Sequence, residues 1–183
     1  MKALDRYLQN VRINKAKKYI RKNDTVLDIG SSNGVLFEKC RGLIRSGIGI
    51  DPVLPAPVKT CLYTLLPGYF PDTWPEGMTF DVITMLAVLE HIPPAIQATL
   101  EGHCSRLLNK GGRIIITAPS SRVDHILRIL IWLRLIDGMS LTEHYGFNPK
   151  LTRQIFPEKY YKLISKHRFQ FGLNNLFVFE KIN

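Results

Sequence analysis

The segment from residue 25 to 37, which reads T-V-L-D-I-G-S-S-N-G-V-L-F, constrains the fold more than any other part of the chain. Val26, Leu27 and Ile29 form an apolar run without polar alternation, which is typical of a parallel strand buried on both faces. Gly30 and Gly34 then bracket a tight turn, and an apolar stretch opens an expected helix. Because glycines let the backbone approach a ligand closely, and the N–H groups of a first helical turn point at it, this order predicts a nucleotide-binding corner. A turn that serves only strand–helix packing is the alternative.

Asp28 lies at the end of the predicted strand, beside this turn. A dinucleotide would place its pyrophosphate here, where a carboxylate repels it. The spacing D-x-G-x-x-x-G also departs from the G-x-G-x-x-G of dinucleotide sites, which disfavours a nicotinamide-dependent oxidoreductase. A ligand with a cationic centre suits the carboxylate better. S-adenosylmethionine, with its sulfonium and ammonium groups, is such a ligand.

A second acid, Asp51, ends the next predicted strand, which spans residues 46–51. It lies about twenty residues beyond Gly30, where a doubly wound fold presents an acid to the ribose hydroxyls of a nucleotide. A carboxylate can accept hydrogen bonds from both hydroxyls at once. The two acids are therefore expected to face a common cleft.

Several motifs resemble a known family. V-L-D-I-G-S-S-N-G is similar to the first motif of class I S-adenosylmethionine-dependent methyltransferases, D-x-G-x-G-x-G, with Ser32 at the middle glycine, and Asp51 is similar to the acid of the second motif. The segment F-D-V-I-T-M-L-A-V-L-E-H-I-P-P resembles the fourth-strand motif of the type 11 methyltransferase family, and L-L-N-K-G-G resembles the L-K-P-G-G that precedes the fifth strand. The resemblance extends from residue 25 to the C-terminus.

The resemblance implies a set of cofactor-binding residues. Pro52 is expected to border the adenine. Tyr69 and Phe70 are expected to stack on or edge it, in the segment Gly68-Tyr69-Phe70 that stands in place of the family's common Gly-Asp, so that Tyr69 replaces the acid. Met85 and Leu86 are expected beside the adenosyl-methionine side of the cofactor. No catalytic residue is assigned, because methyl transfer needs no fixed catalytic triad; His91 and His144 are candidate bases for which a structural role is an equal explanation. No metal ligands are predicted. The full predicted set is Asp28, Gly30, Ser31, Ser32, Gly34, Asp51, Pro52, Tyr69, Phe70, Met85 and Leu86.

The implied fold is α/β: a Rossmann-like, doubly wound, mostly parallel seven-stranded sheet with an antiparallel C-terminal strand and helices on both faces. A length of 183 residues suits one domain over 1–183. We expect a basic N-terminal helix over 1–23, with Leu4, Leu8, Val11, Ala16 and Ile20 on its apolar side, and a helical cover over 121–160. The basic side of the N-terminal helix is interpreted as a solvated outer face, and a basic rim over the substrate entrance is the alternative. Alternating residues over 166–171 and 176–181 predict a closing hairpin.

The composition bounds the partners and the compartment. A net charge of +10 favours an anionic partner, but nucleic acid is not preferred because there is no room for a recognition domain and no N-P-P-Y-like tetrapeptide. The apolar segment 123–137 is too short to span a bilayer; it is interpreted as a buried helix, a membrane-surface contact, a substrate contact or a dimer contact. Three widely spaced cysteines, and a charged N-terminus without the apolar core of a secretory signal, predict a cytoplasmic protein.

The resulting functional prediction is S-adenosylmethionine-dependent methyl transfer to a small-molecule or amphiphilic substrate by in-line displacement. The alternative is a catalytically inactive partner subunit that still binds S-adenosylmethionine.

Overall fold

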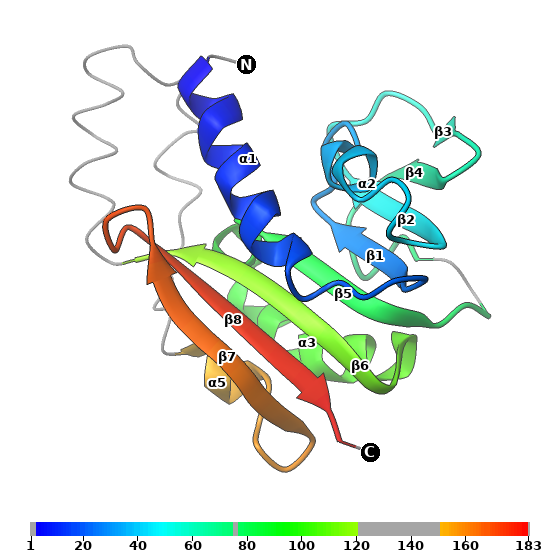
Figure 1. The fold of residues 1–183 in the computed structure, drawn as a ribbon. Helices are drawn as coiled ribbons and strands as arrows, with labels where there is room; N and C mark the ends of the chain where they lie inside the picture. The colour runs from blue at the N-terminus through cyan, green and yellow to red at the C-terminus, as the bar shows by residue number, and fades with distance from the viewer. Residues whose placement is uncertain (1–2, 75–76, 121–150, 183) are drawn as a thin grey trace.

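The computed structural model describes residues 3–74, 77–120 and 151–182. In this part of the chain, eight strands form one sheet in the order β3-β4-β2-β1-β5-β6-β8-β7 (Figure 1). The strands are β1 Thr25–Ile29, β2 Ser46–Asp51, β3 Val58–Lys59, β4 Tyr63–Pro67, β5 Phe80–Leu86, β6 Leu108–Pro119, β7 Tyr161–Phe169 and β8 Asn174–Lys181. The α-helices are α1 Ala3–Lys17, α2 Val35–Lys39, α3 Pro94–Leu107 and α5 Thr152–Ile155.

The sheet confirms the predicted Rossmann-like class. Strands β4, β2, β1, β5 and β6 run parallel to one another, whereas β8 is antiparallel to both β6 and β7. One strand more than the predicted seven is present, because the two residues of β3 pair antiparallel with Thr64 and Leu65 at the outer edge. The predicted hairpin is also confirmed, although its first strand already begins at Tyr161.

Both faces of the sheet are covered by helices, which explains why its strands lack polar alternation. Helices α1 and α2 lie over one face, and α3 and α5 lie over the other (Figure 1). Neighbouring residues of a strand enter opposite cores. In β1, Val26 packs in the core beneath α1 and α2, and Leu27 packs in the core beneath α3; in β5, Val82 and Ile83 divide in the same way.

Helix α1 ends at Lys17, before the predicted end of the N-terminal helix at residue 23. The chain turns there, with the Tyr19 N–H donating to the Ala16 carbonyl at 2.9 Å, and the Tyr19 carbonyl accepts a hydrogen bond from the Arg113 guanidinium of β6. The buried residues of this region are Ile13, Ala16 and Ile20, so the apolar side includes Ile13, which the predicted stripe lacked, whereas Leu4 and Leu8 are only half-buried.

Several predictions concern residues that the structure does not describe. The apolar segment 123–137 and His144 lie outside the described residues. Of the predicted cover over 121–160, only residues 151–160 are described, and they contain α5. Among the helices that are described, none is long and apolar enough to cross a membrane. The cytoplasmic location and the single domain over 1–183 stay predictions.

A hydrogen bond between distant parts of the chain gives a stability test. The Tyr19 hydroxyl, just after α1, lies 2.8 Å from the Ser165 hydroxyl of β7. Substitution Tyr19→Phe should lower the free energy of unfolding by about 0.5–1.5 kcal/mol, because the bond is lost and the ring is kept. Urea denaturation measures the change. The exposed Tyr160→Phe is the matched control, and equal stability of the two variants would show that the bond contributes nothing.

Candidate functional site

The glycine turn lies where the strand order reverses, because β1 sits between β2 and β5 while the chain leaves toward α2 (Figure 1). Ligands of open α/β sheets bind at this point, outside the carboxyl ends of the strands. Gly30, Ser32 and Gly34 have φ angles of 78°, 48° and 77°, so three alternate residues take the left-handed conformation. Ser32 adopts the backbone conformation suited to a glycine, at a cost of about 1–2 kcal/mol.

Close packing on both sides makes the two glycines necessary. A Cβ atom at Gly30 would lie 2.2 Å from Cγ2 of Val88, which follows β5. A Cβ atom at Gly34 would lie 3.0 Å from the ring of Tyr63 in β4. The turn is therefore fitted tightly between segments from two other strands.

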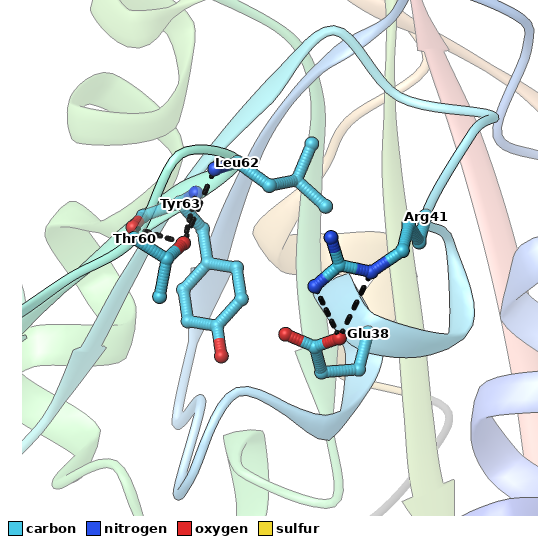
Figure 2. Close-up of polar contacts among 5 residues, drawn as sticks. All are labelled: Glu38, Arg41, Thr60, Leu62 and Tyr63. Atoms are coloured by element: carbon cyan, nitrogen blue, oxygen red, sulfur yellow. Dashed lines mark hydrogen bonds and ion pairs between the residues drawn. The ribbon is translucent and has the colours of Figure 1, made fainter.

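The ring of Tyr63 supports the start of α2 from beneath. It stacks on the ring of Phe37 with their centroids 5.0 Å apart. Figure 2 shows it between the turn at Thr60, whose hydroxyl accepts the Tyr63 N–H at 2.9 Å, and the pair in which Arg41 donates to Glu38 at 2.7 Å. The Arg41 hydrogen bond lowers the pKa of Glu38, so this carboxylate stays charged at the exposed end of α2.

Asp51, at the end of β2, ties the turn to the neighbouring strand. One carboxylate oxygen accepts the Ser32 N–H at 2.7 Å, and the other accepts the Val53 N–H at 3.0 Å. Each oxygen has a second lone pair that can accept a hydroxyl group. Asp51 thus has two roles: it holds the glycine turn in place, and it offers a carboxylate beside that turn. Only the carboxylate beside the turn was predicted from the sequence.

Asp28 is the more deeply placed acid, with 4% of its surface exposed. The Thr84 hydroxyl of β5 donates to it at 2.6 Å. Burial raises the pKa of Asp28 to about 7; the Thr84 hydrogen bond opposes this effect and the Asp51 charge adds to it. A nearby cation would lower this pKa, because it favours the charged carboxylate.

A pocket opens between this corner and α1. Half of its wall residues were absent from the predicted site: Gln9, Arg12, Ile13 and Leu36. The basic side of the N-terminal helix was interpreted as a solvated face, with a rim over the substrate entrance as the alternative, and neither interpretation placed Arg12 in the cofactor site. Gln9, Arg12, Ile13 and Ala16 have the i, i+3, i+4, i+7 spacing of one helix face, and the polar pair within that pattern was the available signal. The lining residues are Gln9, Arg12, Ile13, Asp28, Gly30, Ser31, Leu36 and Leu86.

The other predicted residues lie around the same edge of the sheet with different exposures. Pro52 and Tyr69 are exposed, after β2 and β4 respectively, together with Val53. Phe70 and Met85 are buried in the core, where the ring of Phe70 meets that of His103 with their centroids 6.2 Å apart. Contact of these residues with a cofactor stays a prediction.

The L-E-H segment forms a short 3-10 turn over Leu89–His91 after β5. Glu90 is 2% exposed, and burial raises its pKa to about 7, while a backbone hydrogen bond and the Arg12 charge oppose this effect. His91 is half-buried. The turn thus places a second buried acid near the α1 wall of the pocket.

Comparison with known proteins identifies relatives of this chain. The profile of a family described as methyltransferase domain matches residues 3–166. Protein-L-isoaspartate O-methyltransferase 1 of Cupriavidus necator is 26% identical over 159 residues, covering 81% of this chain and 53% of the relative. Ubiquinone biosynthesis O-methyltransferase of Paraburkholderia phytofirmans is 30% identical over 124 residues, covering 63% of this chain and 53% of the relative. The chain therefore spans about half the length of these curated relatives.

Solved structures share the fold. A Haloferax volcanii protein assigned as a methyltransferase, in complex with the Trm112 methyltransferase activator, superimposes with a TM-score of 0.68 at 14% identity, covering 100% of this chain and 99% of that one. SMU.776, assigned as a methyltransferase and complexed with SAH, superimposes with a TM-score of 0.61 at 12% identity, covering 93% of this chain and 48% of that one. These structures confirm the predicted fold, and the matching profile confirms the predicted resemblance to the methyltransferase family.

The raised pKa of Asp28 predicts a pH dependence of stability. The folded chain keeps a proton on Asp28 between its ordinary pKa of 3.8 and about 7, whereas the unfolded chain loses it. The free energy of unfolding should therefore fall as pH rises through this window, by up to about 1.4 kcal/mol per pH unit from this group. Asp28→Asn does not titrate, so its stability relative to the wild type should increase with pH, as measured by urea denaturation.

The exposed Asp72→Asn is the control for this titration, and its stability should follow the wild type at every pH. Parallel curves for Asp28→Asn and the wild type would show that Asp28 is already ionised in the folded chain.

Proposed function

The chain belongs to the methyltransferase-domain family, and we propose that it binds S-adenosylmethionine and transfers its methyl group to a small-molecule or amphiphilic acceptor. The observation that carries this proposal is that Asp28 and Asp51 both lie beside the glycine turn, at the point where the strand order of the sheet reverses. Three residues of this turn have a left-handed backbone conformation. The residues fit the cofactor, because a buried carboxylate suits its cationic end and a carboxylate at the end of β2 suits its ribose.

In this reaction the protein would bind the cofactor and the acceptor, orient them toward each other and exclude water. When bound, S-adenosylmethionine would supply a methyl group on a cationic sulfur: the acceptor lone pair would form the bond to carbon, the sulfur would keep the electrons of the broken bond and become neutral, and a hydroxyl acceptor would release its proton to solvent. Asp51 would accept hydrogen bonds from the ribose hydroxyls, and Asp28 would face the positive charge. Val53 and Tyr69, with exposed fractions of 76% and 69%, would gain cover from an adenine ring. Holding acceptor and methyl group in line would contribute up to about 7–11 kcal/mol to lowering the barrier.

The relatives support an oxygen acceptor. Both curated relatives are named O-methyltransferases, and the second acts in ubiquinone biosynthesis, which favours an amphiphilic acceptor. We therefore propose hydroxylated aromatic amphiphiles as the first substrates to test. Turnover of any acceptor would exclude the alternative of an inactive partner subunit, which the methyltransferase relatives do not favour. The activator complex of the Haloferax volcanii protein motivates the same assay in the presence of copurifying proteins.

Calorimetry with S-adenosylhomocysteine tests the cofactor assignment. The wild type should bind this ligand and should not bind NAD. Asp51→Ala should weaken binding by about 1–3 kcal/mol, because charge-assisted hydrogen bonds to the ribose are lost. Glu158→Ala, which removes a carboxylate whose side chain is 82% exposed, is the control and should bind like the wild type.

Asp51 also holds the Ser32 N–H, so Asp51→Asn is a second variant that keeps one acceptor oxygen for the loop. Circular dichroism should show that both variants are folded at the titration temperature. Unchanged affinity in folded Asp51→Ala would contradict the ribose assignment, and NAD binding by the wild type would overturn the proposed function.

A further inference from the structure

We propose that Arg12 of α1 binds the carboxylate of the cofactor's methionine portion and so closes the amino-acid end of the pocket. This inference rests on the proposed function and extends it to a wall of the site that the sequence motifs do not contain. Arg12 lies on the helix that packs over the glycine turn, and it lines the same pocket as Asp28, Gly30 and Ser31. A helix outside the motif segments thereby contributes a cation to the predicted binding corner.

One donor of the Arg12 guanidinium is left without an acceptor by the residues that the structure describes. Its Nε atom is buried and has no hydrogen-bond partner among them, which is costly for a charged donor. The nearby acid Glu90 does not fill this role, because its own Oε2 atom is buried without a partner among the same residues and burial raises its pKa to about 7. An anionic ligand group in the pocket would supply an acceptor for the Nε donor.

The charge of Arg12 survives its burial. Desolvation lowers the pKa of Arg12, but the charges of Glu90 and Asp5 oppose this effect, and arginine remains protonated in proteins. The charges of Glu90 and Asp5 thus favour the protonated form of Arg12 without supplying the acceptor that its Nε atom lacks among the described residues. The planar guanidinium remains suited to a carboxylate, with which arginine forms paired hydrogen bonds.

The opposite charges of the pocket match the amino-acid end of the cofactor. Asp28 lies at the end of β1 and Arg12 lies on α1, so the pocket has an acidic and a basic wall. The methionine portion carries an ammonium and a carboxylate on the same carbon. Its ammonium suits the acidic wall and its carboxylate suits Arg12, which fixes the direction in which the ligand enters the pocket.

Calorimetry with two ligands isolates this contact. S-adenosylhomocysteine carries the carboxylate, and its decarboxylated analogue keeps the adenosine, the sulfur and the amino group. The wild type should bind S-adenosylhomocysteine about 10- to 100-fold more tightly than the analogue. In Arg12→Met this ratio should fall toward one, because only the ligand with a carboxylate loses affinity. Arg6→Met, which removes an exposed arginine of the same helix, should keep the wild-type ratio.

Arg12→Lys covers the case in which Arg12→Met does not fold. It keeps the charge and loses the planar pair of donors, so it should lower the ratio by a smaller factor. A wild-type ratio in a folded Arg12 variant would overturn the assignment of the carboxylate to Arg12. Failure of the wild type to bind either ligand would instead overturn the proposed function.

Discussion

The carboxylate of Asp51 is the interaction on which the arrangement of the site depends. Its two hydrogen bonds, to the N–H groups of Ser32 and Val53, join the binding turn to the end of β2. The turn needs such a tie because three of its residues are left-handed and one of them is a serine. A strained backbone of this kind persists only where its surroundings determine it, here through Asp51 on one side and the Tyr63 and Val88 side chains against the glycines.

Buried charge around the pocket costs the chain stability. Asp28 and Glu90 have pKa values near 7, and Arg12 is partly desolvated, so the ligand-free site contains groups that each prefer water. Clusters of perturbed titratable groups in a cleft are typical of functional sites. A ligand that carries both charges of an amino acid would relieve this cost. Affinity and stability are thereby linked at the same residues.

The sequence predicts those parts of the fold that local pattern determines. Strand β2 has the predicted bounds, and the C-terminal hairpin forms where the alternating residues predicted it, although β7 begins earlier. Strand β3 was missed because two exposed residues form a strand only through the turn at Thr60. Arg12 was not assigned to the cofactor site because the basic side of the helix was interpreted as solvated or as a rim over the substrate entrance. Only the packing of α1 on the sheet brings this residue to the pocket.

The position of α1 has a consequence for the order in which the fold assembles. The segment that follows this helix is bonded to distant strands, through Tyr19 and Ser165 of β7, which are 146 residues apart in sequence, and through Arg21 and Glu180 of β8, whose charged atoms are 3.7 Å apart. The glycine turn is local in sequence, whereas the wall that carries Arg12 is fixed only when these strands are in place. Because contacts between distant segments require the closure of a long loop, this wall should be among the last parts of the fold to form.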